Sequence, residues 1–191
     1  MPVILSQPGE FEYEEKRSKF RGYCAPVATE EAARAVIDSI RIQHFKANHN
    51  VFAYATRVGN IIRMSDDGEP SGTAGMPVLN VFQKSGVVDY VCVVTRYFGG
   101  TLLGTGGLVR AYKKAAKGAM EASCPIEEII STIYKVHCAY NQFDKIKYTF
   151  DKWGIEILNV EYTDHCLLTV CVTDAQEDLF FSGAFYTILQ E

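Results

Sequence analysis

Several signatures that usually reveal a protein's class are missing from this chain of 191 residues. Its six cysteines form no C-x-x-C pair, so their spacing predicts neither a zinc site nor a thioredoxin-like redox motif. No apolar run approaches the roughly 20 residues that span a membrane. Residues 1–6 lack the length and charge of a signal peptide. We therefore expect a cytoplasmic protein with reduced thiols and no membrane association.

Familiar catalytic motifs are missing as well. No serine lies in a G-x-S-x-G context, and no glycine precedes the Lys-Ser or Lys-Thr of a P-loop. The composition is nevertheless that of a globular protein, with 48% hydrophobic and 22% charged residues. The length leaves room for one large domain or two small ones.

The charge is unevenly distributed along the chain. Residues 1–125 carry 15 lysines and arginines against 12 acidic residues, a net charge of +3. Residues 126–191 carry 4 against 11, a net charge of −7. This asymmetry suggests that the first part of the chain meets an anionic partner and the second does not.

Hydrophobic periodicity predicts two successive segments in which helices and strands mix. In the first, Thr29 is the expected N-cap of a helix, and the predicted strands cover residues 11–14, 20–24, 51–57, 61–64 and 87–94. The predicted helices cover the segment after Thr29, 77–83 and 108–121. Pro125 marks the expected boundary between domains 1–125 and 126–191. In the second, strands at 132–139, 155–162 and 167–172 and helices at 142–152 and 174–189 give a βαββα order.

A glycine-rich segment at residues 95–112 is the most informative feature. Five glycines fall between positions 99 and 107, after a strand-like run and before a helix-like run. A glycine-rich loop that opens into a helix presents backbone N–H groups to an anion such as phosphate. The motif is incomplete, because Val109 occupies the third glycine position of G-x-G-x-x-G. The alternative is that the glycines only permit a tight turn and close packing.

The helix after this segment carries four cations at a spacing that places them on one face: Arg110, Lys113, Lys114 and Lys117. Such a face can follow a phosphate backbone. The alternative is an ordinary solvated helix face.

An acidic segment lies upstream, with Asp66, Asp67 and Glu69 close together before a run of small residues. Carboxylate oxygens suit Mg²⁺, although the spacing is not that of an EF-hand. The alternative is turn chemistry combined with ion pairs, in which Glu69 meets Arg96. Because both loops lead into helices and carry opposite charges, we expect residues 66–77 and 96–110 to meet and form one cleft.

Three further side chains are candidates. His49 precedes a strand, where its imidazole is suited to general acid–base chemistry near neutral pH. Tyr97 and Phe98, beside Arg96, are suited to stacking on nucleic-acid bases, or equally to covering the core.

Three segments together resemble the IMPACT/YigZ family: residues 49–54, 65–77 and 94–112. One position departs from the family pattern, because Asn50 stands where a second histidine is expected. The resemblance implies an α+β fold, with a domain like the second domain of ribosomal protein S5 followed by a small ferredoxin-like domain. It also implies a cytosolic role linked to translation control. Eukaryotic members bind a co-activator of a starvation-response kinase.

The leading hypothesis is a non-enzymatic regulator of translation that binds RNA or the ribosome through the first domain. The binding residues expected are Arg96, Tyr97, Gly99, Gly100, Gly104, Gly106, Gly107, Arg110, Lys113, Lys114 and Lys117. One alternative is an enzyme with a small-molecule phosphate-handling or hydrolytic site that uses His49, Asp66, Asp67 and Glu69 with the glycine-rich loop, where Mg²⁺ could bind. Another is a protein-binding module. No cofactor is expected, and the oligomeric state is left open.

Overall fold

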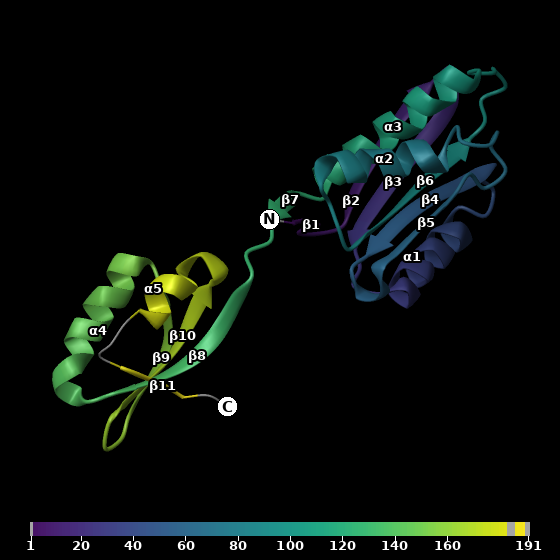
Figure 1. Cartoon of the computed structure of the whole chain (residues 1–191). Helices are drawn as coiled ribbons and strands as arrows, with labels where there is room; N and C mark the ends of the chain where they lie inside the picture. The colour runs from purple at the N-terminus through teal and green to yellow at the C-terminus, as the bar shows by residue number, and fades with distance from the viewer. Residues whose placement is uncertain (1, 183–185, 190–191) are drawn as a thin grey trace. The chain divides into compact units, whose positions relative to one another are not determined.

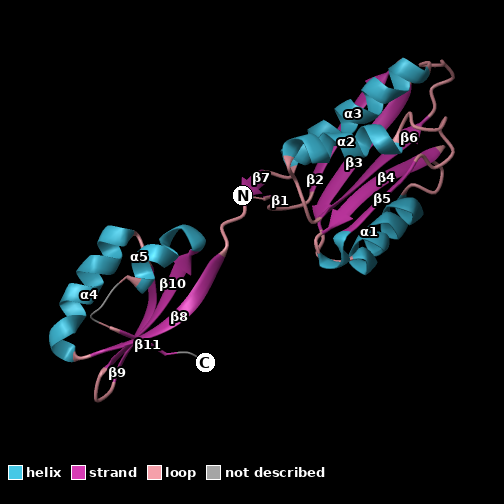
Figure 2. Ribbon diagram, viewed as in Figure 1, coloured by secondary structure: helices cyan, strands magenta, loops and turns pink. Residues whose placement is uncertain are grey.

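The computed structural model describes residues 2–182 and 186–189. Within these ranges the chain forms two compact units, which divide between Glu128 and Ile129. Both units combine helices with β-sheet (Figure 2), as the predicted α+β class requires. The strand β7 (Pro125–Glu127) pairs with β1 (Val3–Leu5), so the residues directly after the expected boundary belong to the first unit.

The first unit is built on a five-stranded antiparallel sheet with the strand order β2-β3-β6-β4-β5. The strands are β2 (Gly9–Glu15), β3 (Ser18–Pro26), β4 (His49–Thr56), β5 (Ile61–Ser65) and β6 (Tyr90–Tyr97). The central strand β6 is buried from Tyr90 through Arg96 because both faces of the sheet are covered by helices. The prediction ended this strand at residue 94, and the real strand continues to Tyr97.

Helices cover both faces of this sheet (Figure 1). On one face lies α1 (Glu30–Gln43), whose buried stripe is Ala33, Ile37 and Ile40. Thr29 caps it as predicted, because its hydroxyl accepts from the Ala32 N–H. On the other face, α2 (Gly75–Ser85) and α3 (Thr105–Ala122) cover the larger apolar core.

Four of the six cysteines are buried, at positions 24, 92, 138 and 166, and all six are free thiols. Burial, together with the neighbouring Cys92 thiol, raises the pKa of Cys24 well above its usual value. These cysteines therefore serve as small apolar core residues.

The second unit has a four-stranded antiparallel sheet in the order β11-β8-β10-β9. Its elements are β8 (Ser131–Cys138), α4 (Tyr140–Trp153), β9 (Glu156–Tyr162), β10 (Cys166–Thr173), α5 (Glu177–Phe181) and β11 (Thr187–Leu189). The single helix predicted over residues 174–189 is wrong: only α5 is α-helical, and β11 pairs with the outer edge of β8. Residues 183–185 of that range lie outside the described residues. None of the helices in the described ranges is long and apolar enough to cross a membrane.

Candidate functional site

The acidic segment and the start of the glycine-rich segment meet through one buried ion pair. Arg96 Nη1 donates to Glu69 Oε1 over 2.6 Å, and the two residues are only 5% and 8% exposed. The Tyr112 hydroxyl from α3 donates to the same oxygen over 2.7 Å. Burial, reinforced by the charge of Glu69, raises the pKa of Tyr112. The prediction that Glu69 meets Arg96 is therefore confirmed.

Arg96 does not reach the surface, where a ligand would meet it. Its guanidinium lies over two aromatic rings, 5.5 Å from the Phe20 centroid and 5.4 Å from that of Phe98. Its Nε has no hydrogen-bond partner among the described residues. The expectation that Arg96 binds RNA assumed that the loop begins at residue 95, but β6 holds this side chain inside the unit. The neighbouring Tyr97 is likewise engaged, with its hydroxyl 2.9 Å from His44 Nδ1.

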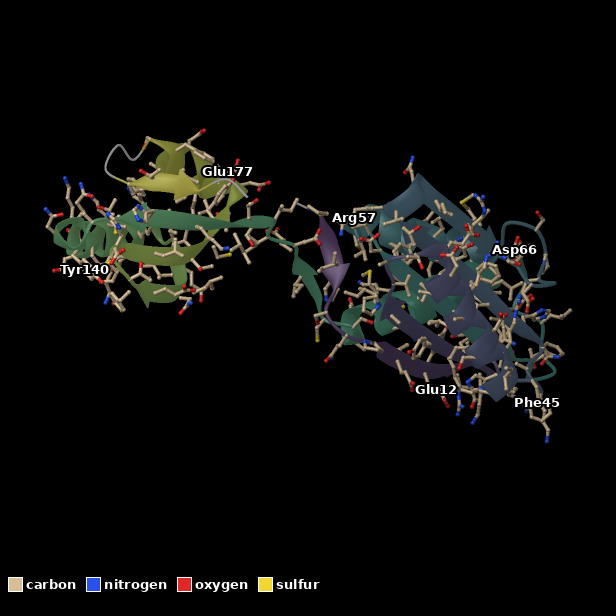
Figure 3. The ribbon with its side chains drawn as sticks, turned by 90° about the horizontal axis from the view of Figure 1, so that it is seen from below. Glu12, Phe45, Arg57, Asp66, Tyr140 and Glu177 are labelled. Atoms are coloured by element: carbon tan, nitrogen blue, oxygen red, sulfur yellow. The ribbon has the colours of Figure 1, made fainter. Side chains whose placement is uncertain are left out.

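The carboxylates of the acidic segment organise the backbone. Asp66, labelled in Figure 3, accepts N–H groups from Gly72, Ala74 and Gly75, and so caps the start of α2. Although partial burial works against ionisation, these three hydrogen bonds lower the pKa of Asp66. Asp67 accepts the Asn50 N–H over 2.6 Å. Asp67 also accepts from Arg41 Nη2 over 3.3 Å, so turn chemistry explains Asp66 and an ion pair with a backbone hydrogen bond explains Asp67. No group of three or more potential ligands is placed to hold a metal within the described ranges.

His49 lies beside this ion pair in a defined orientation. Its Nδ1 is 2.8 Å from the Asp67 carbonyl oxygen, which can only accept, so Nδ1 carries the proton. Nε2 faces Glu69 at 3.8 Å. Asn50 accepts from the Thr95 hydroxyl over 2.8 Å inside the core. The His49 imidazole therefore lies beside the Glu69 carboxylate and presents its Nε2 edge to it.

The glycines of the glycine-rich segment fall into two groups. Gly99 packs on the β2–β3 turn: a Cβ there would lie 2.0 Å from the carbonyl group of Arg17, so only glycine fits. Gly100 and Gly104 have positive φ angles of 82° and 73°, which L residues rarely adopt. Tight packing and turn geometry thus account for these three positions. Gly106 and Gly107 lie in the first turn of α3. Neither has a positive φ, and a Cβ at either position would meet only side-chain atoms, at 3.6 Å and 3.0 Å.

The four cations of α3 are all exposed, as the spacing predicts. Hereafter they are called the basic face: Arg110, Lys113, Lys114 and Lys117. Lys117 pairs with Glu121 over 3.5 Å, and within the described residues this is the only ion pair on that face. The predicted meeting of residues 66–77 and 96–110 is confirmed by the Glu69–Arg96 ion pair, whereas a shared cleft between them stays a prediction.

A cavity of about 250 Å³ lies between the end of β2 and the first turns of α3. Hereafter it is called the β2–α3 cavity, and its lining residues are Tyr13, Glu15, Lys16, Leu103, Gly107, Arg110, Ala111 and Lys114. Sequence reasoning identified Arg110, Lys114 and Gly107 but missed Lys16 and Tyr13. The available signal was a Lys16–Arg17 pair between two strands, a position where hairpin turns favour Asn and Gly.

The chain has clear relatives. Residues 16–120 match the model of the Impact N-terminal domain, and residues 136–180 match a domain of unknown function. The chain is 36% identical over 177 residues to the IMPACT family member YigZ of Escherichia coli, covering 91% of this chain and 87% of YigZ. It is 33% identical over 177 residues to YvyE of Bacillus subtilis, covering 92% and 82%.

A crystal structure described as that of a hypothetical protein superposes with a TM-score of 0.63 at 33% identity, covering 99% of this chain and 96% of that one. The similarity thus extends through both units. The first domain model alone matches more than half of the residues. The chain belongs to the IMPACT family.

Proposed function

We propose that this protein regulates translation by binding RNA, free or within the ribosome, through the basic face of α3. Family membership supports the link to translation that the resemblance implies. The observation that carries the RNA assignment is the exposure of four cations on one helix face, of which only Lys117 has an acidic partner among the described residues. Such a face attracts a polyanion irrespective of sequence.

The attraction must be local to α3. Counted to the boundary between the two units, residues 1–128 carry 15 cations against 14 acidic residues, a net charge of +1. Residues 129–191 carry 4 against 9, a net charge of −5. Because the first unit is nearly neutral, its affinity for RNA depends on where its cations cluster. The acidic second unit repels a polyanion. We therefore propose that it orients the first unit on its target or binds a protein partner.

The sequence suggested that Arg96 binds RNA, but in this proposal Arg96 has a structural role. Its charge is matched by Glu69 and shielded from solvent. It therefore positions the segment that leads into α3 and does not contact RNA. The same holds for Asp66, Asp67 and Glu69, whose oxygens already accept hydrogen bonds from protein groups.

The topology supports the finer fold assignment that the resemblance implies. The second unit has the β-α-β-β-α-β order of a ferredoxin-like domain, with β11 as the last strand. The first unit, an antiparallel sheet with paired helices on one face, supports the comparison with the second domain of ribosomal protein S5. We propose both assignments, together with a cytoplasmic location, where RNA and ribosomes are available.

The test measures binding to RNA across a salt series. Replacing Lys113 and Lys117 with Glu removes two cations from the basic face without touching the buried face of α3. Each lost phosphate contact should flatten the slope of log K against log salt by about 0.7. The double variant should therefore bind more weakly at low salt, with a slope smaller by about 1.4.

The matched control reverses two exposed lysines outside α3, Lys46→Glu and Lys84→Glu, with the same change in net charge. It should bind almost as wild type. If both double variants behave alike, α3 is a solvated helix face and the protein-binding alternative takes precedence. Folding is checked by urea denaturation, because exposed substitutions usually change stability by less than about 0.5 kcal/mol.

A further inference from the structure

We propose that the β2–α3 cavity binds a terminal phosphate group, that is, a phosphomonoester. This inference rests on the proposed function, because it gives the basic face a defined anchoring point on an RNA end. Cations from two separate elements converge on this cavity: Lys16 from the β2–β3 turn, and Arg110 and Lys114 from α3. A run of cations along one helix face does not enclose a ligand, whereas these cations surround a concave site.

Two of these cations are without a protein partner. Lys16 and Arg110 make no ion pair with any described residue, although Glu15 lines the same cavity. Long charged side chains that are left unpaired around a concave site favour an anionic ligand, since the anion gains charge-assisted hydrogen bonds that no protein group supplies. The cavity therefore has an excess of positive charge that no described protein group neutralises.

The third cation, Lys114, is held in position by the aromatic ring of Tyr13. Lys114 Nζ lies 4.3 Å from the centroid of the Tyr13 ring. Tyr13 is itself fixed, because its hydroxyl donates to the Ala111 carbonyl over 2.8 Å. Burial raises the pKa of Tyr13, so this hydroxyl stays protonated and remains a donor. Lys114 is therefore restrained next to the cavity before a ligand arrives, which lowers the entropy lost on binding.

The backbone of α3 adds to the positive field. The helix begins after Gly104, which has no side chain to accept the first amide groups, and Gly107 in the first turn lines the cavity. The start of a helix carries a partial positive charge that stabilises anions. This contribution supplements the three side chains and does not define the site without them.

The turn that carries Lys16 is fixed by the glycine-rich segment. Lys16 and Arg17 form a two-residue hairpin turn with φ angles of 47° and 65°, where Asn and Gly are favoured. Gly99 packs directly on the Arg17 carbonyl group, which holds the turn in this conformation. The glycine-rich segment therefore contributes to the site indirectly, by placing Lys16 opposite α3.

Charge and size select a terminal phosphate. The lining holds three cations and one carboxylate, a net charge of +2. A terminal phosphate carries about −1.5 to −2 at neutral pH, whereas an internal phosphodiester carries a single negative charge. The volume of about 250 Å³ lies below the range of roughly 300–1,000 Å³ that encloses a complete small ligand. The cavity thus suits a phosphate group attached to a larger molecule that stays outside.

The experiment compares two RNA strands of one sequence, labelled at the 3′ end and carrying either a 5′-phosphate or a 5′-hydroxyl group. Wild type should bind the 5′-phosphorylated strand more tightly by about tenfold or more. This factor corresponds to the free energy of one charge-assisted hydrogen bond. The variants Lys16→Gln and Arg110→Gln should reduce this ratio to about one. Both side chains are exposed, so folding should be unaffected.

Lys113→Gln is the matched control, because Lys113 belongs to the basic face but does not line the cavity. It should weaken binding of both strands by the same factor and leave their ratio unchanged. A wild-type ratio near one, or loss of the ratio in Lys113→Gln, would overturn the terminal-phosphate proposal. Salt-dependent RNA binding without a 5′ preference would overturn this proposal alone and leave the proposed function standing.

A third ligand separates the two sources of a phosphomonoester. Adenosine 5′-monophosphate is tested by its effect on thermal unfolding of the intact protein. If the protein binds neither RNA strand but is stabilised by this nucleotide, and Arg110→Gln abolishes the effect, the cavity binds free phosphomonoesters and the proposed function fails. If neither RNA nor the nucleotide binds, both proposals are overturned.

Discussion

Arg96 and Glu69 form a buried ion pair 2.6 Å long, which joins the central strand of the first unit to the acidic segment. Tyr112 from α3 donates to the same carboxylate. Three segments that are distant in sequence are thus tied to one side chain. Glu69 thus links the sheet, the acidic segment and α3 through the hydrogen bonds that its carboxylate accepts.

Replacing Glu69 with Gln should destabilise the protein by about 3–5 kcal/mol, since it leaves the buried Arg96 charge without its counter-charge. The measurement is urea unfolding followed by circular dichroism. A double variant, Glu69→Leu with Arg96→Met, should recover much of this loss because it removes both buried charges. Lys117→Gln, which breaks an exposed pair, should cost no more than about 1 kcal/mol. Equal costs for Glu69→Gln and Lys117→Gln would contradict the assignment.

The glycine-rich segment offers a second prediction that separates packing from backbone freedom. Gly99→Ala forces a Cβ against the Arg17 carbonyl group, so it should cost about 1–3 kcal/mol. Gly100→Ala meets no atom within 4 Å, but its positive φ should cost about 1–2 kcal/mol. Gly106→Ala, in the first turn of α3, should instead be neutral or stabilise by up to about 1 kcal/mol. A stable Gly99→Ala variant would mean that the segment packs differently.

Much of the first unit could be predicted because its helices and strands have clear periodicity. The stripe that includes Ala33 and Ile37 identified α1, and Thr29 identified its start. The pairing of Glu69 with Arg96 was also anticipated, since opposite charges in two neighbouring loops need partners. Periodicity describes local structure only, however, and it placed the end of β6 too early. That single error moved Arg96 from the core to an expected surface.

The remaining features depend on contacts between distant residues. β11 is a strand because the outer edge of β8 needs a partner, and nothing within residues 174–189 reveals that edge. Likewise, the reason for Gly99 is the Arg17 carbonyl group, which lies far away in sequence. The β2–α3 cavity was missed because Lys16 joins Arg110 and Lys114 only after the sheet has formed.

A third prediction concerns the boundary between the units. Residues 1–128 should fold alone, because the first unit has its own sheet and two apolar cores. A fragment of residues 1–124 should be less stable, since it lacks β7, the partner of β1. It also lacks Glu128, which accepts from Arg57, labelled in Figure 3. Both fragments are compared by urea unfolding and amide hydrogen exchange. Equal stability would show that the β1–β7 ribbon contributes nothing to the unit.

The last prediction uses the acid sensitivity of the cap on α2. The folded-state pKa of Asp66 is lowered from its ordinary value, 3.8, because three backbone N–H groups favour the carboxylate over the protonated form. Its contribution is therefore fully present above about pH 4, the usual range of an unfolded aspartate. It is lost as the pH falls through the lower, folded-state pKa.

Asp66→Ala should destabilise the protein at pH 7 by about 1–2 kcal/mol, the usual cost of losing a helix cap. The difference from wild type should shrink as the pH falls below 4, because the wild-type carboxylate is then protonated. Urea unfolding at pH 7, 5 and 3 measures this convergence. Gln43→Ala, at an exposed position on α1 that carries no titratable group, should run parallel to wild type throughout. If the wild-type and Asp66→Ala curves also stay parallel, the Asp66 charge does not stabilise the start of α2.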